Sequence, residues 1–280
     1  MELIYPKPTY VIKDAPLYET FEVTAASQNI LNVLQAFDFA AEQARTLGKP
    51  ALLQGIGEAL VARVIFYECN KKSGSRLDKT DNYQKTSTVS LRLKNDGLFK
   101  FKVDSPYVVG FVELDNKERS RALVQEGYDA NCKGKELIKP IKDAFICNLI
   151  ARARDNNRFA PAIEENPLKL STAQVKGKSE YGQHPNVVAV FGSVKLGELN
   201  ASYLNERGYD AGFVCDFTAK DLEVMLKGKE DSAHMRSVGL GYGCSINGIY
   251  AYDYFSKDGS ARAVVHVDAQ KVPVEVPRSS

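Results

Sequence analysis

The sequence predicts an α+β protein whose largely antiparallel sheet is packed by helices. Segments with the alternation typical of strands are interspersed with segments at helical spacing along the 280 residues. More of the strand-like segments are joined by short turns than by helices, which favours antiparallel pairing. Apolar residues make up 44% and charged residues 26%, as in globular proteins with a core. We therefore expect a single elaborated domain over residues 1–280.

The first predicted element is an amphipathic helix that Thr24 can cap and that Gly48 and Pro50 end. Its apolar residues recur at spacings of three and four, at Ile30, Leu34, Phe37, Ala41 and Ala44. Residues 59–67 are apolar almost throughout, which fits a buried strand and the end of a second helix equally well.

A polar loop and a β-hairpin come next. Residues 70–85 are polar and are expected to form a surface loop or mobile finger. Residues 86–94 and 98–104 both alternate, and Asn95-Asp96-Gly97 has the composition of a tight turn between them. We expect residues 70–104, the basic loop plus the hairpin, to protrude as a subdomain.

The second half of the chain predicts two helices and four strands. The helices are expected at residues 133–157 and at residues 218–226, where Thr218 and Asp221 form a capping box. The strands are expected at residues 187–191, 212–217, 249–255 and 261–267. Residues 271–280 predict an extended, loosely held tail.

Composition excludes several classes of protein. The five cysteines have no CxxC spacing, which favours reduced thiols in the cytoplasm over disulfides or a zinc site. His184, His234 and His266 are not at metal-ligand spacing, so we expect no metal and no other cofactor. We find no signal peptide in the first ten residues and no apolar run long enough to cross a bilayer, so no membrane partner is expected.

Local clusters of basic residues suggest an anionic partner, although the net charge is only +2. The polar loop carries Lys71, Lys72, Arg76, Lys79 and Lys85. One face of the predicted hairpin carries Arg92, Lys94, Lys100 and Lys102, with no acidic residue interleaved among them on that strand face. Phosphates would relieve the repulsion between these cations. The alternative is a solvated face whose lysines discourage edge-to-edge pairing of strands.

A glycine-rich segment near the C-terminus is the third candidate for binding. The backbone amides of Gly241, Tyr242 and Gly243 could approach a phosphate. Alternatively, the glycines mark a β-bulge or a close crossing of two backbones. Tyr250, Tyr252 and Tyr254 share a strand face, which fits a base-stacking platform, a core stripe or a subunit contact.

The segment Gly241-Tyr-Gly243-Cys-Ser-Ile-Asn-Gly248-Ile resembles the glycine-rich loop of the RAMP proteins, the RNA-binding subunits of CRISPR effector complexes. The loop here is shorter and lacks the final glycine of the family pattern. Residues 187–210 are also similar in pattern to the middle of backbone subunits in that family. The resemblance covers under a quarter of the chain, and it implies an RRM-like core, a mobile finger and several copies along a guide RNA.

These patterns predict a non-enzymatic subunit that binds single-stranded RNA or DNA and assembles as a homo-oligomer or multi-subunit complex. Two alternatives remain open. The chain could be a structural oligomer of a virus or mobile element. It could also be an enzyme or small-molecule binder whose site is scattered in the sequence, with Asp216, His184 and Glu126 as candidates.

Overall fold

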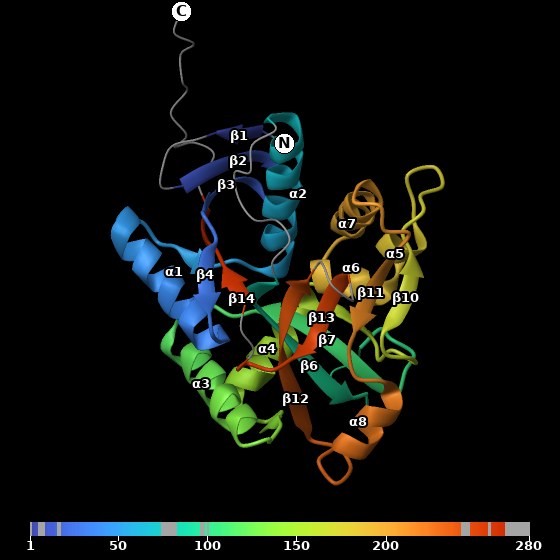
Figure 1. Cartoon of the computed structure of the whole chain (residues 1–280). Coiled ribbons are helices and arrows are strands. Elements are labelled where there is room, and N and C mark those ends of the chain that lie inside the picture. The colour runs from blue at the N-terminus through green and yellow to red at the C-terminus, as the bar shows by residue number, and fades with distance from the viewer. Residues whose placement is uncertain are drawn as a thin grey trace, which may run out of the picture.

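Two β-sheets organise the fold in the computed structural model (Figure 1). The structure describes residues 2–4, 9–15, 18–73, 83–95, 99, 101–241, 247–256 and 259–266. Within these residues, the smaller sheet has five strands in the order β1 (Glu2–Ile4), β2 (Thr9–Ala15), β3 (Glu19–Thr24), β15 (Ala263–His266) and β5 (Leu52–Leu53).

The larger sheet has ten strands among the described residues, and its central strands are β12 (Ser232–Gly241) and β6 (Gln84–Lys94). On the side of β12 follow β13 (Gly248–Asp253), β11 (Ala211–Cys215) and β10 (Leu168–Ser171). On the side of β6 follow β14 (Gly259–Ala261) and β4 (Ser27–Ile30). The remaining strands branch from this path: β7 (Tyr107–Glu113) pairs with β6 and with β9 (Phe159–Pro161), and β8 (Leu137–Pro140) pairs with β12.

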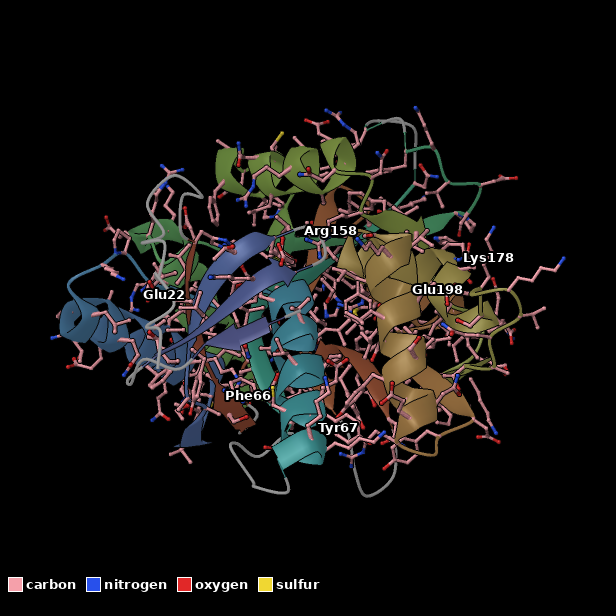
Figure 2. All side chains as sticks on the ribbon, turned by 90° about the horizontal axis from the view of Figure 1, so that it is seen from above. Glu22, Phe66, Tyr67, Arg158, Lys178 and Glu198 are labelled. Carbon is pink, nitrogen blue, oxygen red and sulfur yellow. The ribbon has the colours of Figure 1, made fainter. Side chains whose placement is uncertain are left out.

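Helix α2 (Ile56–Ser73) lies between the two sheets. Every residue from Ile56 to Phe66 is buried, the charged residues Glu58 and Arg63 included. Seen from above, α2 runs between the strands of the smaller sheet and α7 (Val194–Glu206) (Figure 2). Helices α5 (Glu180–Gln183) and α6 (Pro185–Phe191) pack beside α7, and together with α2 they enclose one hydrophobic core.

A second hydrophobic core lies under α1 (Val33–Leu47), α3 (Glu118–Cys132) and α4 (Ala144–Asp155). Helix α1 confirms the first predicted helix. It ends as expected at Gly48, whose φ of 62° is left-handed and favours glycine. It begins later than expected, because the Asn32 side chain caps it and residues 27–30 form β4 instead. Helix α8 (Ala219–Met225) confirms the predicted capping box of Thr218 and Asp221.

The presence of both helices and strands is confirmed, but the predicted fold class is wrong, because the described residues do not form the RRM-like core that the resemblance implies. An RRM has one four-stranded sheet. Here the described strands form two sheets, and the larger one has ten strands. Most described strand pairs of this sheet are antiparallel, and the exceptions are β11 with β13 and β14 with β6, which run parallel.

The predicted hairpin is also wrong. Strand β6 exists, but it pairs with β7, and Lys94 lies opposite Tyr107. Residues 101–106 are not in a strand. The Asn95 side chain donates hydrogen bonds to the carbonyls of Val103 and Ser105, both at 2.9 Å, and so closes a longer connection than the tight turn we expected. Strand β6 is central, and its residues 84–93, part of the expected protruding subdomain 70–104, are buried.

Two further elements were assigned to the wrong type. The helix predicted at residues 133–157 is divided, because Leu137–Pro140 forms β8 and Asp143 caps a separate helix α4. The strand predicted at residues 187–191 belongs to α6, which His184 caps and Pro185 begins. The open choice at residues 59–67 is settled as helix α2. No helix in the described part of the chain is long and apolar enough to cross a membrane.

Candidate functional site

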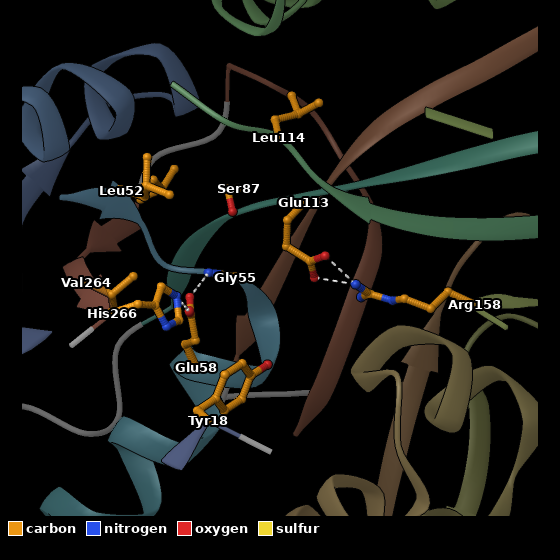
Figure 3. A pocket seen from close by; sticks show the side chains of 11 residues that line it. Tyr18, Leu52, Gly55, Glu58, Ser87, Glu113, Leu114, Arg158, Val264 and His266 are labelled. Carbon is orange, nitrogen blue, oxygen red and sulfur yellow. Dashed lines mark hydrogen bonds and ion pairs between the residues drawn. The ribbon is translucent and has the colours of Figure 1, made fainter. Parts of the chain in front are cut away.

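A pocket of about 240 Å³, lined by both charged and apolar residues, lies where the smaller sheet meets the larger one. We call it the carboxylate pocket (Figure 3). Strands β5 and β15 line it from the smaller sheet, β6 and β7 line it from the larger sheet, and α2 begins at its edge. Its lining residues are Tyr18, Leu52, Leu53, Gly55, Glu58, Ser87, Glu113, Leu114, Arg158, Val264 and His266.

One carboxylate of the pocket is Glu58 in the first turn of α2. Its Oε2 accepts a hydrogen bond of 2.6 Å from the backbone N–H of Gly55, which fixes the side chain at the start of the helix. Its Oε1 lies 2.6 Å from Nε2 of His266, the last described residue of β15. The hydrogen bond to Glu58 raises the pKa of His266, although burial opposes this change. The imidazole is 52% exposed, so it can exchange protons with solvent.

The second carboxylate is Glu113 at the end of β7. Burial would raise its pKa, yet the Arg158 guanidinium bonded to both of its oxygens holds the pKa below the usual range. Arg158 is held in turn by the carbonyls of Ala189 and Val190 in α6, the first at 3.1 Å from Nε. The Glu113 side chain is still 39% exposed, because it lines the cavity.

Two glycines make room for these groups. A Cβ at Gly55 would lie 2.9 Å from Cγ of Glu113 and 3.5 Å from a carboxylate oxygen of each of Glu58 and Glu113. The two carboxylates therefore converge on the same small space in front of Gly55. A Cβ at Gly57 would lie 2.2 Å from the Tyr18 hydroxyl, so only glycine admits that hydroxyl here.

Tyr18 completes the polar part of the pocket. Burial and the charges of Glu58 and Glu113 raise the pKa of Tyr18 well above its usual value, so the phenol stays protonated. Its hydroxyl has no hydrogen-bond partner among the residues that the structure describes. It is therefore ready to bond a ligand, and its ring offers the negative face of an aromatic system.

The charges of the pocket do not cancel when His266 is neutral. Glu58 and Glu113 are two carboxylates, and Arg158 is the one lining residue that is always cationic. Each carboxylate oxygen has two lone pairs, so both groups can accept bonds beyond those they already make. Within the described residues, no group of three or more His, Cys, Asp and Glu side chains suits a metal ion.

The residues predicted to bind nucleic acid do not form one surface. Lys85 and Arg92 are buried at 1% and 0% exposure, so the predictions of Lys85 on a surface loop and Arg92 on an outer strand face are wrong. Arg92 points inward, and its Nη2 lies 2.5 Å from Oδ1 of Asp216. Lys94 ends β6 and Lys102 lies within the β6–β7 connection, and both are exposed. Lys71 and Lys72 end α2, where Lys71 lies 3.7 Å from Glu206.

Five other predicted residues lie outside the described part of the chain: Arg76, Lys79, Lys100, Tyr242 and Gly243. Gly241 ends β12, and a Cβ there would lie 2.5 Å from the Tyr250 ring. The larger sheet also has a register shift between Ser237 and Gly239, and a Cβ at Gly248 would meet the Phe213 carbonyl at 2.0 Å. The described glycines thus fit the alternative of a bulge and a close backbone crossing. Nucleic-acid binding and oligomer assembly stay predictions.

The candidates for a scattered site are placed apart from the carboxylate pocket. Asp216 is buried in its pair with Arg92, His184 caps α6, and Glu126 pairs on the surface with Lys139 at 2.7 Å. Sequence reasoning missed Tyr18, Glu58, Glu113 and Arg158, and it considered His266 only as a metal ligand. No local motif could have found them, because they come from five separate segments.

The comparisons with known proteins do not name a function. No protein-family model and no curated protein matches the chain. A similar solved structure, described as "Accommodation of massive sequence variation in Nanoarchaeota by the C-type lectin fold", aligns at a TM-score of 0.49 and 12% identity, over 84% of this chain and 94% of that chain. A likeness of this extent carries no argument about fold or function. The resemblance to RAMP proteins stays a prediction.

Proposed function

We propose that this protein binds a small organic cation, an ammonium group on a short aliphatic chain, in the carboxylate pocket. The observation that carries the proposal is the convergence of Glu58 and Glu113 on the space in front of Gly55. An ammonium is a donor without an acceptor, so it matches carboxylates that still have free lone pairs. The Tyr18 ring adds an aromatic face beside the charge.

The apolar residues of the pocket define the rest of the ligand. Leu52, Leu114 and Val264 lie beside the charged groups (Figure 3). They would cover a short hydrocarbon chain and exclude water from it. A volume of about 240 Å³ admits a ligand of a few heavy atoms and is too small for most drug-sized molecules. A short alkylammonium has both the cationic group that the carboxylates would bind and the short hydrocarbon chain that the apolar residues would cover.

Calorimetric titration with n-butylammonium at a pH above the pKa of His266 tests the proposal. We expect n-butylammonium to bind, and butan-1-ol and butyrate to bind much more weakly. Glu58→Gln keeps an oxygen for the Gly55 amide but removes the charge. This substitution should lower the affinity for n-butylammonium at least about tenfold, because a hydrogen bond to a charged group contributes about 1.5–3 kcal/mol.

The matched control is Glu164→Gln, which removes the same charge from an exposed position away from the pocket. It should leave the affinity unchanged. Equal affinity for n-butylammonium and butan-1-ol, or equal effects of the two substitutions, would show that the carboxylates do not select a cation. Circular dichroism of both variants confirms that any lost binding is not lost folding.

A further inference from the structure

A second cavity, of about 410 Å³, lies on the other side of β9 from the carboxylate pocket. We call it the aromatic–basic cavity, and its lining residues are Phe101, Lys102, Val103, Arg154, Asp155, Asn157 and Phe159. Arg158 points into the first pocket and its neighbour Phe159 lines the second, because successive residues of an extended strand face opposite sides. The two cavities thus have separate walls and can take separate ligands.

Half-buried aromatic rings form one wall of this cavity. The ring centroids of Phe101 and Phe159 are 4.2 Å apart, and those of Phe99 and Phe101 are 5.8 Å apart. Phe159 lies over Gly110 of β7, where a Cβ would come within 2.4 Å of the ring. The two hydrogen bonds from the Asn95 side chain hold the backbone at Val103 and Ser105, which follows Phe101. The wall is therefore preorganised, and its remaining exposed ring surface can stack on a planar group.

Two cations stand beside these rings. Lys102 is exposed, and no carboxylate of the described residues lies within ion-pair distance of it. Arg154 is paired with its neighbour Asp155 at 2.9 Å, but both side chains are exposed, at 43% and 65%, so the pair can open at little cost. With Asp155 as the one acidic lining residue, the cavity carries a net positive charge.

We propose that the aromatic–basic cavity binds a nucleotide unit, a base that stacks on the phenylalanine rings with its phosphate on Lys102 and Arg154. A simple anion would use the cations and leave the rings in water, while an uncharged aromatic would do the reverse. A nucleotide supplies the planar ring and the anion together, and the volume suits a ligand of that size. The proposal is independent of cation binding in the carboxylate pocket.

NMR titration with AMP, adenosine and inorganic phosphate tests the inference. AMP should bind more tightly than adenosine or phosphate. Lys102→Gln should lower the affinity for AMP at least about fivefold, because one contact to the phosphate is lost. Phe101→Leu removes a stacking ring while keeping an apolar side chain and should weaken both AMP and adenosine. The control Lys227→Gln removes the same charge from an exposed site away from the cavity, and it should leave the affinities for AMP and adenosine unchanged.

An oligonucleotide of eight uridines, titrated beside AMP, identifies the source of the nucleotide unit. Tighter binding of the oligomer, with an affinity that falls steeply with salt, assigns the cavity to single-stranded nucleic acid. Binding of AMP alone assigns it to free nucleotides. AMP binding that is equal in Lys102→Gln and Lys227→Gln, or phosphate binding as tight as AMP binding, would overturn the inference. These results do not depend on whether n-butylammonium binds.

Discussion

At the scale of single residues, the polar side chains of β6 are turned into the protein and are hydrogen-bonded there. The Thr86 hydroxyl donates to the Val238 carbonyl at 2.7 Å, and the Ser90 hydroxyl donates to the Ala251 carbonyl at 2.6 Å. Arg92, next on the same face, bonds Asp216 and the Ala251 carbonyl. Alternation in a sequence identifies the residues that share a face, but not whether another element covers that face. The charge pattern alone therefore placed Arg92 wrongly.

The buried pair of Arg92 and Asp216 gives a stability prediction. Asp216→Ala leaves the Arg92 guanidinium buried without its counterion, so we expect a loss of about 3–5 kcal/mol in the free energy of unfolding. Replacing both residues, as Arg92→Met with Asp216→Leu, should recover much of this loss, because no unpaired charge remains. Urea unfolding followed by circular dichroism measures these differences.

The exposed pair of Glu42 and Arg45 provides the control for this experiment. Glu42→Ala should cost less than about 1 kcal/mol, since an exposed ion pair contributes little. A cost for Asp216→Ala as small as that of Glu42→Ala would contradict the account of a buried pair.

At the scale of elements, the helices with clear end signals were predictable and the apolar segments were not. Gly48 ends α1 and Thr218 begins α8 as the sequence indicates. The apolar run at residues 187–191 was mistaken for a strand, because a buried strand and a buried helix have the same pattern over so few residues. The strands of the smaller sheet preceding residue 27 were missed, and β8 was read as part of a long helix.

The capping box of α8 gives a prediction at this scale. The Thr218 hydroxyl accepts from the Asp221 backbone N–H at 3.2 Å, and the Asp221 side chain accepts from the Thr218 backbone N–H at 2.9 Å. Thr218→Ala removes the hydroxyl cap and should lower the free energy of unfolding by about 1 kcal/mol. Thr46→Ala, at an exposed position within α1, should change it by less than about 0.5 kcal/mol. If Thr218→Ala and Thr46→Ala changed the free energy of unfolding in urea equally, the cap would contribute nothing to stability.

At the scale of the whole molecule, the carboxylate pocket exists because the two sheets meet at the start of α2. Its charged and phenolic groups come from the turn before β3, from α2, from the end of β7, from the residue before β9 and from β15: Tyr18, Glu58, Glu113, Arg158 and His266. Sequence patterns report local structure, whereas this site depends on how distant segments pack. For that reason the mixture of helices and strands was predictable and the candidate site was not.

The pKa of His266, measured by NMR with and without saturating n-butylammonium, tests the central claim most directly. In the free protein, the hydrogen bond to Glu58 raises this pKa above its ordinary value. An ammonium bound at Glu58 and Glu113 competes with the imidazolium, so the pKa should fall on binding. By linkage, the affinity for n-butylammonium should rise as the pH increases through the pKa of His266. A pKa that stays the same or rises when the ligand is bound would contradict the account.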